Sequence, residues 1–244
     1  HRKMDKKFLK TEKVFILSEN YVRNYGIKDL IDDTFKEPIT NDMSMVIICK
    51  GNPKDYLLYK IEGYPSSADF LEGLLDSSIY ENFYCNNFKL IDLFVRLDAE
   101  GRSVVLPYIE LGENGIYKSG VSLFKEDKMV CKLNIEETKW MNILREDHSK
   151  GSMSLEYNNN TFIDFYLNIK RKVKSKKIND EYKFSIDLEI EGEILSNKTD
   201  KKVFDDPIVQ EEVSRDLEKN IEKECENFIN NIVKKYKVDC FELG

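Results

Sequence analysis

Histidine is scarce in this chain of 244 residues: two are present, and one of them is His1. His148 is therefore the only internal imidazole. The polar stretch around it indicates an exposed loop, although Asp147 beside it could orient it for catalysis. The patterns G-x-S-x-G, H-E-x-x-H, G-x-x-x-x-G-K-[ST] and G-x-G-x-x-G are absent as well. The sequence predicts no catalytic residue and no cofactor-binding residue, and it indicates a protein that is not an enzyme.

Cysteine motifs are also lacking. The count is odd and no two cysteines have C-x-x-C spacing, which argues against a zinc site and against a redox motif. We interpret the five as free buried thiols that act as small hydrophobic residues: Cys49, Cys85, Cys131, Cys225 and Cys240. Trp140, the only tryptophan, is expected in the core rather than in a ligand cage. The sequence predicts no metal site, and it predicts no cofactor.

A long apolar run and an excess of positive charge are missing too. No stretch approaches the roughly 18 apolar residues of a membrane-spanning helix; residues 45–49 are typical of the longest. The 38 basic and 45 acidic residues give a net charge of −7, which argues against a nucleic-acid partner. The chain shows no signal peptide and does not begin with methionine, so we expect a piece of a longer protein.

Carboxylates are plentiful, and acidic pairs occur at residues 32–33, 136–137 and 205–206. We interpret these pairs as residues of helix boundaries, where acidic side chains are common. Two carboxylates that are distant in sequence can nevertheless meet in a hydrolase, so a carboxylate hydrolase stays open as a third alternative.

Aromatic residues are abundant, with 14 Phe and 13 Tyr, and this composition excludes a disordered chain. In the first half, short apolar strands alternate with helices. A strand at 14–17 is followed by a helix capped by Ser18, and Asn52-Pro53 opens another helix. Further elements are strands at 43–49 and at 104–106, the latter closed by Pro107, and helices at 27–33, 66–75 and 87–97. The last helix has an inner face of Phe88, Ile91, Phe94 and Val95.

The second half is richer in hairpins. Strands are expected at 117–124, 128–133, 151–157, 161–175, 182–195 and 238–241. A helix from Pro207 to about residue 235 carries one apolar stripe, namely Val213, Leu217, Ile221, Cys225, Phe228 and Ile232. The fold class is therefore α+β: an N-terminal α/β domain, residues 1–112, precedes a C-terminal region, 113–244, of antiparallel hairpins packed against long amphipathic helices. A further division near residue 150 stays open.

One hairpin can be predicted to the residue. Apolar residues occupy odd positions from 163 and even positions from 184, and charged residues fill the alternate positions. With a two-residue turn at Asn179-Asp180, Lys170 faces Glu189 and Lys172 faces Asp187. One face then belongs to the core and the other is a ladder of opposite charges. The basic run 170–177 is either a solvated hairpin end, the interpretation we favour, or a contact for an anionic membrane.

A recognisable motif begins at Gly120. Residues 120–130 read G-V-S-L-F-K-E-D-K-M-V, with Leu133 and the stretch 136–138 following. The segment resembles the G-x-A-x-F-x-x-D-K-hydrophobic…L…E-T signature of the Ger(x)C family, the C subunits of spore germinant receptors. It departs at Ser122 and Cys131, where the family often has alanine and glycine. Three further stretches resemble the family in order, at 13–27, 50–57 and 236–244.

This resemblance implies a non-catalytic extracytoplasmic subunit of a nutrient germinant receptor, which acts in spore germination by associating with integral membrane A and B subunits. It also implies a lipoprotein at the outer face of the spore inner membrane. Because the lipidated cysteine would precede residue 1, we expect a truncated ectodomain. The alternative is a small-molecule module that binds the germinant in a pocket between the two halves, and direct nutrient binding stays open.

Overall fold

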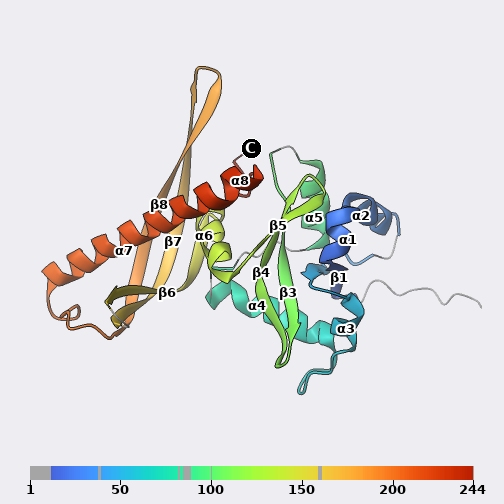
Figure 1. The fold of residues 1–244 in the computed structure, drawn as a ribbon, viewed down its shortest axis with the longest axis horizontal. Coiled ribbons are helices and arrows are strands. Elements are labelled where there is room, and N and C mark those ends of the chain that lie inside the picture. The colour runs from blue at the N-terminus through green and yellow to red at the C-terminus, as the bar shows by residue number, and fades with distance from the viewer. Residues whose placement is uncertain are drawn as a thin grey trace, which may run out of the picture. The chain divides into compact units, whose positions relative to one another are not determined.

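The computed structural model describes residues 12–37, 40–81, 83–84, 89–99, 101–158 and 161–243 (Figure 1). They form two compact units. Unit 1 comprises residues 1–77, 86–136 and 238–244, and unit 2 comprises residues 78–85 and 137–237. Both units combine helices with sheets, so the predicted α+β class is confirmed. The linear division expected after residue 112 falls in the turn between two paired strands of unit 1 and stays a prediction.

A five-stranded sheet forms the centre of unit 1. Its order is β1-β2-β3-β4-β5. The strands are β1 (Val14–Ser18), β2 (Met45–Cys49), β3 (Val105–Gly112), β4 (Gly115–Lys125) and β5 (Lys128–Leu133). The first three strands pair in parallel, because helical segments connect them, whereas the last three form antiparallel hairpins.

Five helices accompany this sheet in the sequence: α1 (Glu19–Asn24), α2 (Lys28–Phe35), α3 (Pro53–Leu58), α4 (Ser67–Glu81) and α5 (Leu90–Asp98). Two of the predicted caps are confirmed. The Ser18 side chain accepts a hydrogen bond from the backbone of Tyr21 at 3.2 Å, and the Asn52 side chain accepts one from Lys54 at 3.1 Å. Residues of α1, α2, α5 and the sheet pack into one apolar core, which includes Val22, Ile31, Ile48, Leu93 and Phe124.

The inner face predicted for α5 is wrong. Leu90 and Leu93 are buried, while Val95 is 50% exposed. Phe94 packs half-buried against the core, and Phe88 lies outside the described residues. The stripe that faces the core is 90, 93, 94 and 97, which has the helical spacing of i, i+3, i+4 and i+7. The helix carries two overlapping apolar stripes, and only the tertiary structure decides between them.

Two strand predictions of unit 1 are also corrected. Pro107 does not close a strand, because β3 runs through it. β2 pairs with β3 only at Tyr108 and Ile109, so no ladder hydrogen bond to β2 is required from Pro107. Residues 238–241 form no strand. Instead, the Asp239 carboxylate accepts hydrogen bonds from the backbone of Phe241 at 2.9 Å and Leu243 at 3.2 Å, and such local bonds compete with a strand ladder.

Unit 2 contains a three-stranded antiparallel sheet with the order β6-β7-β8. The strands are β6 (His148–Asn158), β7 (Thr161–Ile178) and β8 (Glu181–Asn197). The helices are α6 (Ile135–Arg145), α7 (Pro207–Phe228) and α8 (Lys234–Tyr236), with a π-helical turn at Ile229–Val233. The first two residues of α6 belong to unit 1. The long C-terminal helix predicted from the apolar stripe is confirmed, and five of the six stripe residues are buried; Ile232 is half-buried.

The predicted register of the β7–β8 hairpin is confirmed. Lys170 lies opposite Glu189 and Lys172 opposite Asp187. Asn179 and Asp180 form the turn with φ of 52° and 62°, as a tight two-residue turn requires. The ion pairs run diagonally, for example from Lys172 Nζ to Glu189 at 2.9 Å. The apolar face belongs to the core only as far as Ile169, because β6 ends its pairing there; farther out the apolar residues are exposed or half-exposed.

Candidate ligand-binding groove

Helix α7 forms one wall of a groove in unit 2. Its start is fixed by Asp206, whose carboxylate accepts a hydrogen bond from the backbone of Ile208 at 2.9 Å, and by Pro207 at the first helical position. Because apolar residues recur every three or four positions, Val213 and Leu217 face the sheet. The same periodicity places Gln210 and other polar residues beside this stripe.

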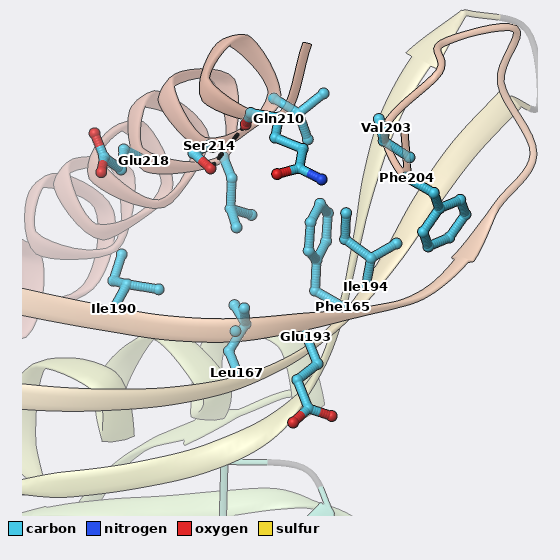
Figure 2. Close-up of a pocket in the computed structure, with 13 residues that line it drawn as sticks. Phe165, Leu167, Ile190, Glu193, Ile194, Val203, Phe204, Gln210, Ser214 and Glu218 are labelled. Atoms are coloured by element: carbon cyan, nitrogen blue, oxygen red, sulfur yellow. Dashed lines mark hydrogen bonds between the residues drawn. The ribbon is translucent and has the colours of Figure 1, made fainter. Parts of the chain in front are cut away.

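The groove has a volume of about 490 Å³ and lies between α7 and one face of β7 and β8 (Figure 2). Phe165 and Leu167 of β7, together with Ile190 and Ile194 of β8, form its floor. Val203 and Phe204, in the segment before α7, also line it. Nine of the thirteen lining residues are apolar or glycine, and the volume lies in the range of sites for small organic molecules.

Few polar groups reach the groove. Figure 2 shows the Gln210 carboxamide directed into the space between α7 and the sheet, whereas the Glu193 carboxylate points away from it. The Ser214 hydroxyl donates a hydrogen bond to the main-chain carbonyl of Gln210 at 2.9 Å. The lining includes Glu218 but no basic side chain. The groove therefore suits a neutral or cationic ligand with an apolar body, and it disfavours an anion.

Gly192 leaves room for the Leu167 side chain in the floor of the groove. It lies directly opposite Leu167, and a Cβ atom at this position would approach Leu167 Cδ2 to 2.5 Å. The Leu167 side chain occupies the space that a larger residue would need. A side chain at position 192 therefore forces Leu167 to move, and the shape of the floor depends on this glycine.

None of these lining residues is predicted from the sequence to form a binding site. The stripe pattern assigns Gln210 and Ser214 to the charged outer faces of the helix, because a stripe predicts which residues face inward but not how deep the neighbouring space is. Their spacing of four residues beside Val213 and Leu217 is the signal that could have found them. It indicates a polar line along the edge of the apolar stripe.

Unit 1 contains a polar cluster, which is centred on Glu110. Its carboxylate accepts hydrogen bonds from Lys50 at 3.0 Å and from Lys132. Burial alone raises the pKa of Glu110, but the hydrogen bonds from the two lysines outweigh it and lower the pKa to about 2. Lys132 also lies over the Tyr108 ring, 4.8 Å from its centroid. The mutual pairing of these charges indicates a structural role.

His148 is exposed, as the sequence predicts, but it begins β6 rather than lying in a loop. The structure offers it no catalytic partner in Asp147, because that carboxylate pairs with Arg171 at 3.3 Å. The Arg171 guanidinium also donates a hydrogen bond to the main-chain carbonyl of Leu144 at 2.9 Å, so Arg171 links Asp147 to the C-terminal end of α6. This arrangement supports a structural role for the segment around His148.

The other reactive side chains are buried. Trp140 is 8% exposed, which confirms its place in the core. Cys49, Cys131, Cys225 and Cys240 are buried thiols, as predicted, whereas Cys85 lies outside the described residues. Burial raises the pKa of the Cys49 and Cys225 thiols to about 12.

The motif that begins at Gly120 belongs to the core of unit 1. Phe124 and Leu133 are fully buried, and the Ser122 hydroxyl donates a hydrogen bond to the carbonyl of Leu106 at 3.0 Å. The Asp127 carbonyl accepts a hydrogen bond from the backbone of Ile27 at 3.0 Å, which joins two of the motif stretches. The motif therefore marks how the β4–β5 hairpin is built and does not mark a binding site.

Two kinds of feature are absent from the part of the chain that the structure describes. No group of three or more His, Cys, Asp or Glu side chains is placed to hold a metal ion there. None of the described helices combines the length and the apolar character needed to cross a membrane.

Comparison with known families gives two matches that together span most of the chain. The family described as "Spore germination B3/ GerAC like, C-terminal" matches residues 119–244. The family described as "Spore germination protein N-terminal domain" matches residues 4–111. The segment between the two matches contains the turn that joins β3 and β4.

Individual proteins show the same relationship. The chain is 24% identical over 231 residues to the spore germination protein YndF of Bacillus subtilis strain 168, covering 93% of this chain and 55% of that protein. It is 24% identical over 229 residues to the spore germination protein GerQC of Bacillus cereus, covering 91% and 62%. The crystal structure of the GerBC protein matches with a TM-score of 0.67 at 17% identity, covering 95% of this chain and 67% of that one. The chain thus spans between about half and two thirds of the length of these relatives.

Proposed function

The chain belongs to the Ger(x)C family of spore germination proteins, described as B3/GerAC like, and from this membership we propose that it works as a non-catalytic subunit of a nutrient germinant receptor. In this proposal it is the C subunit and associates with two integral membrane partners, the A and B subunits. A lipid anchor in the full-length protein holds it at the outer face of the spore inner membrane. The observation that carries the proposal is that the two family matches together extend over residues 4–111 and 119–244.

Side-chain chemistry supports a role without catalysis. The carboxylate beside the only internal histidine, that of Asp147, forms an ion pair with Arg171, and the thiols described by the structure are buried. The motif residues serve the packing of a hairpin. A receptor subunit needs surfaces that contact partners, and such surfaces require no nucleophile.

Co-purification tests the association. The full-length protein, carrying an affinity tag, is expressed together with the A and B subunits and recovered from detergent-solubilised membranes. We expect both membrane subunits to be recovered with it. The control is the Gly120→Ala variant, which should fail to recover them because the β4–β5 hairpin is disrupted. A folded full-length protein that never associates with either subunit overturns the proposal.

The groove favours a second function, namely direct binding of a small germinant molecule, within unit 2 rather than in the pocket between the two halves that the sequence suggests. Its size, its apolar floor and the Gln210 carboxamide suit a small neutral or cationic nutrient. The test is thermal unfolding of the protein with a panel of amino acids and nucleosides. Ligand at about 100 times its dissociation constant adds about 2.7 kcal/mol of stability.

A matched pair of variants makes this second test specific. Ser214→Trp fills the groove from α7, whereas Lys223→Trp places the same ring on the exposed side of that helix. We expect the first variant to abolish a stabilising shift and the second to retain it. No shift with any nutrient, or an equal loss in both variants, contradicts binding in the groove.

A further inference from the structure

The β7–β8 hairpin extends beyond the rest of its sheet. β6 pairs with β7 only as far as His148 opposite Lys170, whereas β7 and β8 stay paired up to Ile178 opposite Glu181. We call residues 172–185 the hairpin tip, and Figure 1 shows it as the end of a two-stranded ribbon. All of its residues except Ile178 are exposed. A two-stranded ribbon alone is marginally stable in water, so the hairpin tip would gain stability from a binding surface.

One face of the hairpin tip is aromatic and apolar. Tyr182 is 65% exposed and Phe184 is 42% exposed, and their rings stack with centroids 6.5 Å apart. Val173, 39% exposed, lies on the same face. Tyrosine combines an apolar ring with a polar end, which makes it common where hydrocarbon meets water. This face therefore has the character of a surface for the boundary between lipid headgroups and acyl chains.

The other face is basic. Four of the five lysines of the hairpin tip lie on it, and the fifth, Lys177, lies opposite Tyr182 on the aromatic face. With two acidic residues, the tip has a net charge of +3 in a chain whose total is −7. An ion pair links Lys172 of this face to Glu189 at 2.9 Å. Lys176 lies directly opposite Lys183, and neither has an ion-pair partner among the residues that the structure describes. Like charges opposite each other in a hairpin repel, and a bound anion relieves this repulsion.

We propose that the hairpin tip docks on an anionic phospholipid bilayer. The tip enters the headgroup layer end first, so that lipid surrounds both of its faces. Tyr182 and Phe184 then contact the upper acyl chains, while Lys176 and Lys183 contact lipid phosphates through their flexible stems. The charge of the tip complements anionic lipid, and its exposed rings supply the apolar part of the contact.

A lipid surface fits the hairpin tip better than an acidic protein does. The aromatic face and the lysine pair lie on opposite sides of the ribbon, since Tyr182 and Lys183 are neighbours in one strand. A protein surface that covers the lysines leaves the rings in water, whereas a headgroup layer contacts both sides at once. Binding to an acidic protein predicts capture by polyglutamate in the absence of vesicles.

Co-sedimentation with vesicles tests this proposal and needs no receptor subunit. The unacylated 244-residue chain is mixed with vesicles of phosphatidylcholine alone or with added phosphatidylglycerol. We expect binding only to the phosphatidylglycerol vesicles. We also expect it to weaken between about 0.1 M and about 1 M salt, as the screening length falls from about 10 Å to about 3 Å.

Variants locate the contact. Lys176→Gln with Lys183→Gln should weaken binding about 30-fold, since one lysine near an anionic membrane contributes a factor of about five. The matched control, Lys219→Gln with Lys223→Gln, makes the same charge change on the exposed side of α7 and should leave binding nearly unchanged. Tyr182→Trp should be quenched by brominated lipid, whereas the wild-type protein, whose only tryptophan is the buried Trp140, should not be.

Several results of the vesicle experiments overturn the proposal. They are equal binding to both kinds of vesicle, an equal loss in the two lysine pairs, and a Tyr182→Trp variant that brominated lipid leaves unquenched. Capture by polyglutamate without any vesicle binding identifies an acidic protein partner and also overturns it. Failure here leaves receptor association untouched, because co-purification with the membrane subunits measures a different contact.

Discussion

Replacing Gly120 with alanine tests whether the motif that marks the family is a packing device. Gly120 has φ of +131°, and a Cβ atom there would lie 1.9 Å from the carbonyl oxygen of Leu133 in β5. Cβ contacts below 3.0 Å do not occur in practice, so the two strands would have to separate by about 1 Å or more. The obstacle is backbone, and a change of rotamer cannot remove it.

The magnitude follows from a comparison with Gly51. This residue has φ of +81°, but no atom lies within 4 Å of the point where a Cβ would stand, so Gly51→Ala introduces backbone strain alone. That strain costs about 1–2 kcal/mol, and the reduced freedom of the unfolded chain offsets about 0.4–1 kcal/mol of it. Gly120→Ala adds the collision between β4 and β5, and we expect a loss of about 3–5 kcal/mol in the free energy of unfolding.

The measurement is urea unfolding, with amide hydrogen exchange of residues 121–133 as the probe of the transition. Exchange is preferred to a single spectroscopic transition, because a chain with two compact units need not unfold in one step. Gly51→Ala is the matched control, since it changes the same residue type at positive φ without a collision. A loss for Gly120→Ala within about 1 kcal/mol of the loss for Gly51→Ala would refute the packing argument.

Three further predictions rest on other parts of the structure. Because the folded pKa of Glu110 is about 2, below its ordinary value of 4.5, its contribution is present above pH 4.5 and lost as the pH falls toward 2. Glu110→Gln should therefore lower stability at neutral pH by about 1–3 kcal/mol and flatten the acid limb of the unfolding curve. The Cys49 and Cys225 thiols, with pKa values of about 12, should react with a disulfide reagent at about pH 8 only after denaturant is added. Leu217→Ala, which removes a buried wall of the groove, should cost about 2–4 kcal/mol in chemical denaturation and enlarge the groove.

The features that the sequence predicted well are local. The caps at Ser18 and Asn52 depend on side chains that reach the backbone two or three residues later. The register of the β7–β8 hairpin follows from alternation and from a two-residue turn, and a slip by one residue would move charged side chains into the core. In each case the interacting residues are close in the sequence or are related by a strict period.

The features that it missed depend on distant parts of the chain. α5 carries two overlapping apolar stripes, and the choice of Leu90 and Leu93 over Val95 depends on which sheet residues face the helix. The groove is lined by residues of β7, β8, α7 and the segment before α7, and no pattern within the helix predicts how these distant residues come together. The apolar face of β7 is exposed toward the turn because the pairing with β6 ends at Lys170. Alternation within β7 does not indicate where its neighbour ends.

These results separate what identifies the family from what can contact a partner. The segment that begins at Gly120 is recognisable because burial and close approach of backbones restrict its residues, as at Phe124 and Leu133. The match to the GerBC structure shows that the fold is shared at 17% identity, although most residues differ. The contacts proposed above with a nutrient and with a membrane involve residues outside the motif. The groove combines a lining of mostly buried apolar residues with the Gln210 carboxamide, whereas the hairpin tip combines exposed rings with lysines, so the two surfaces suit different partners.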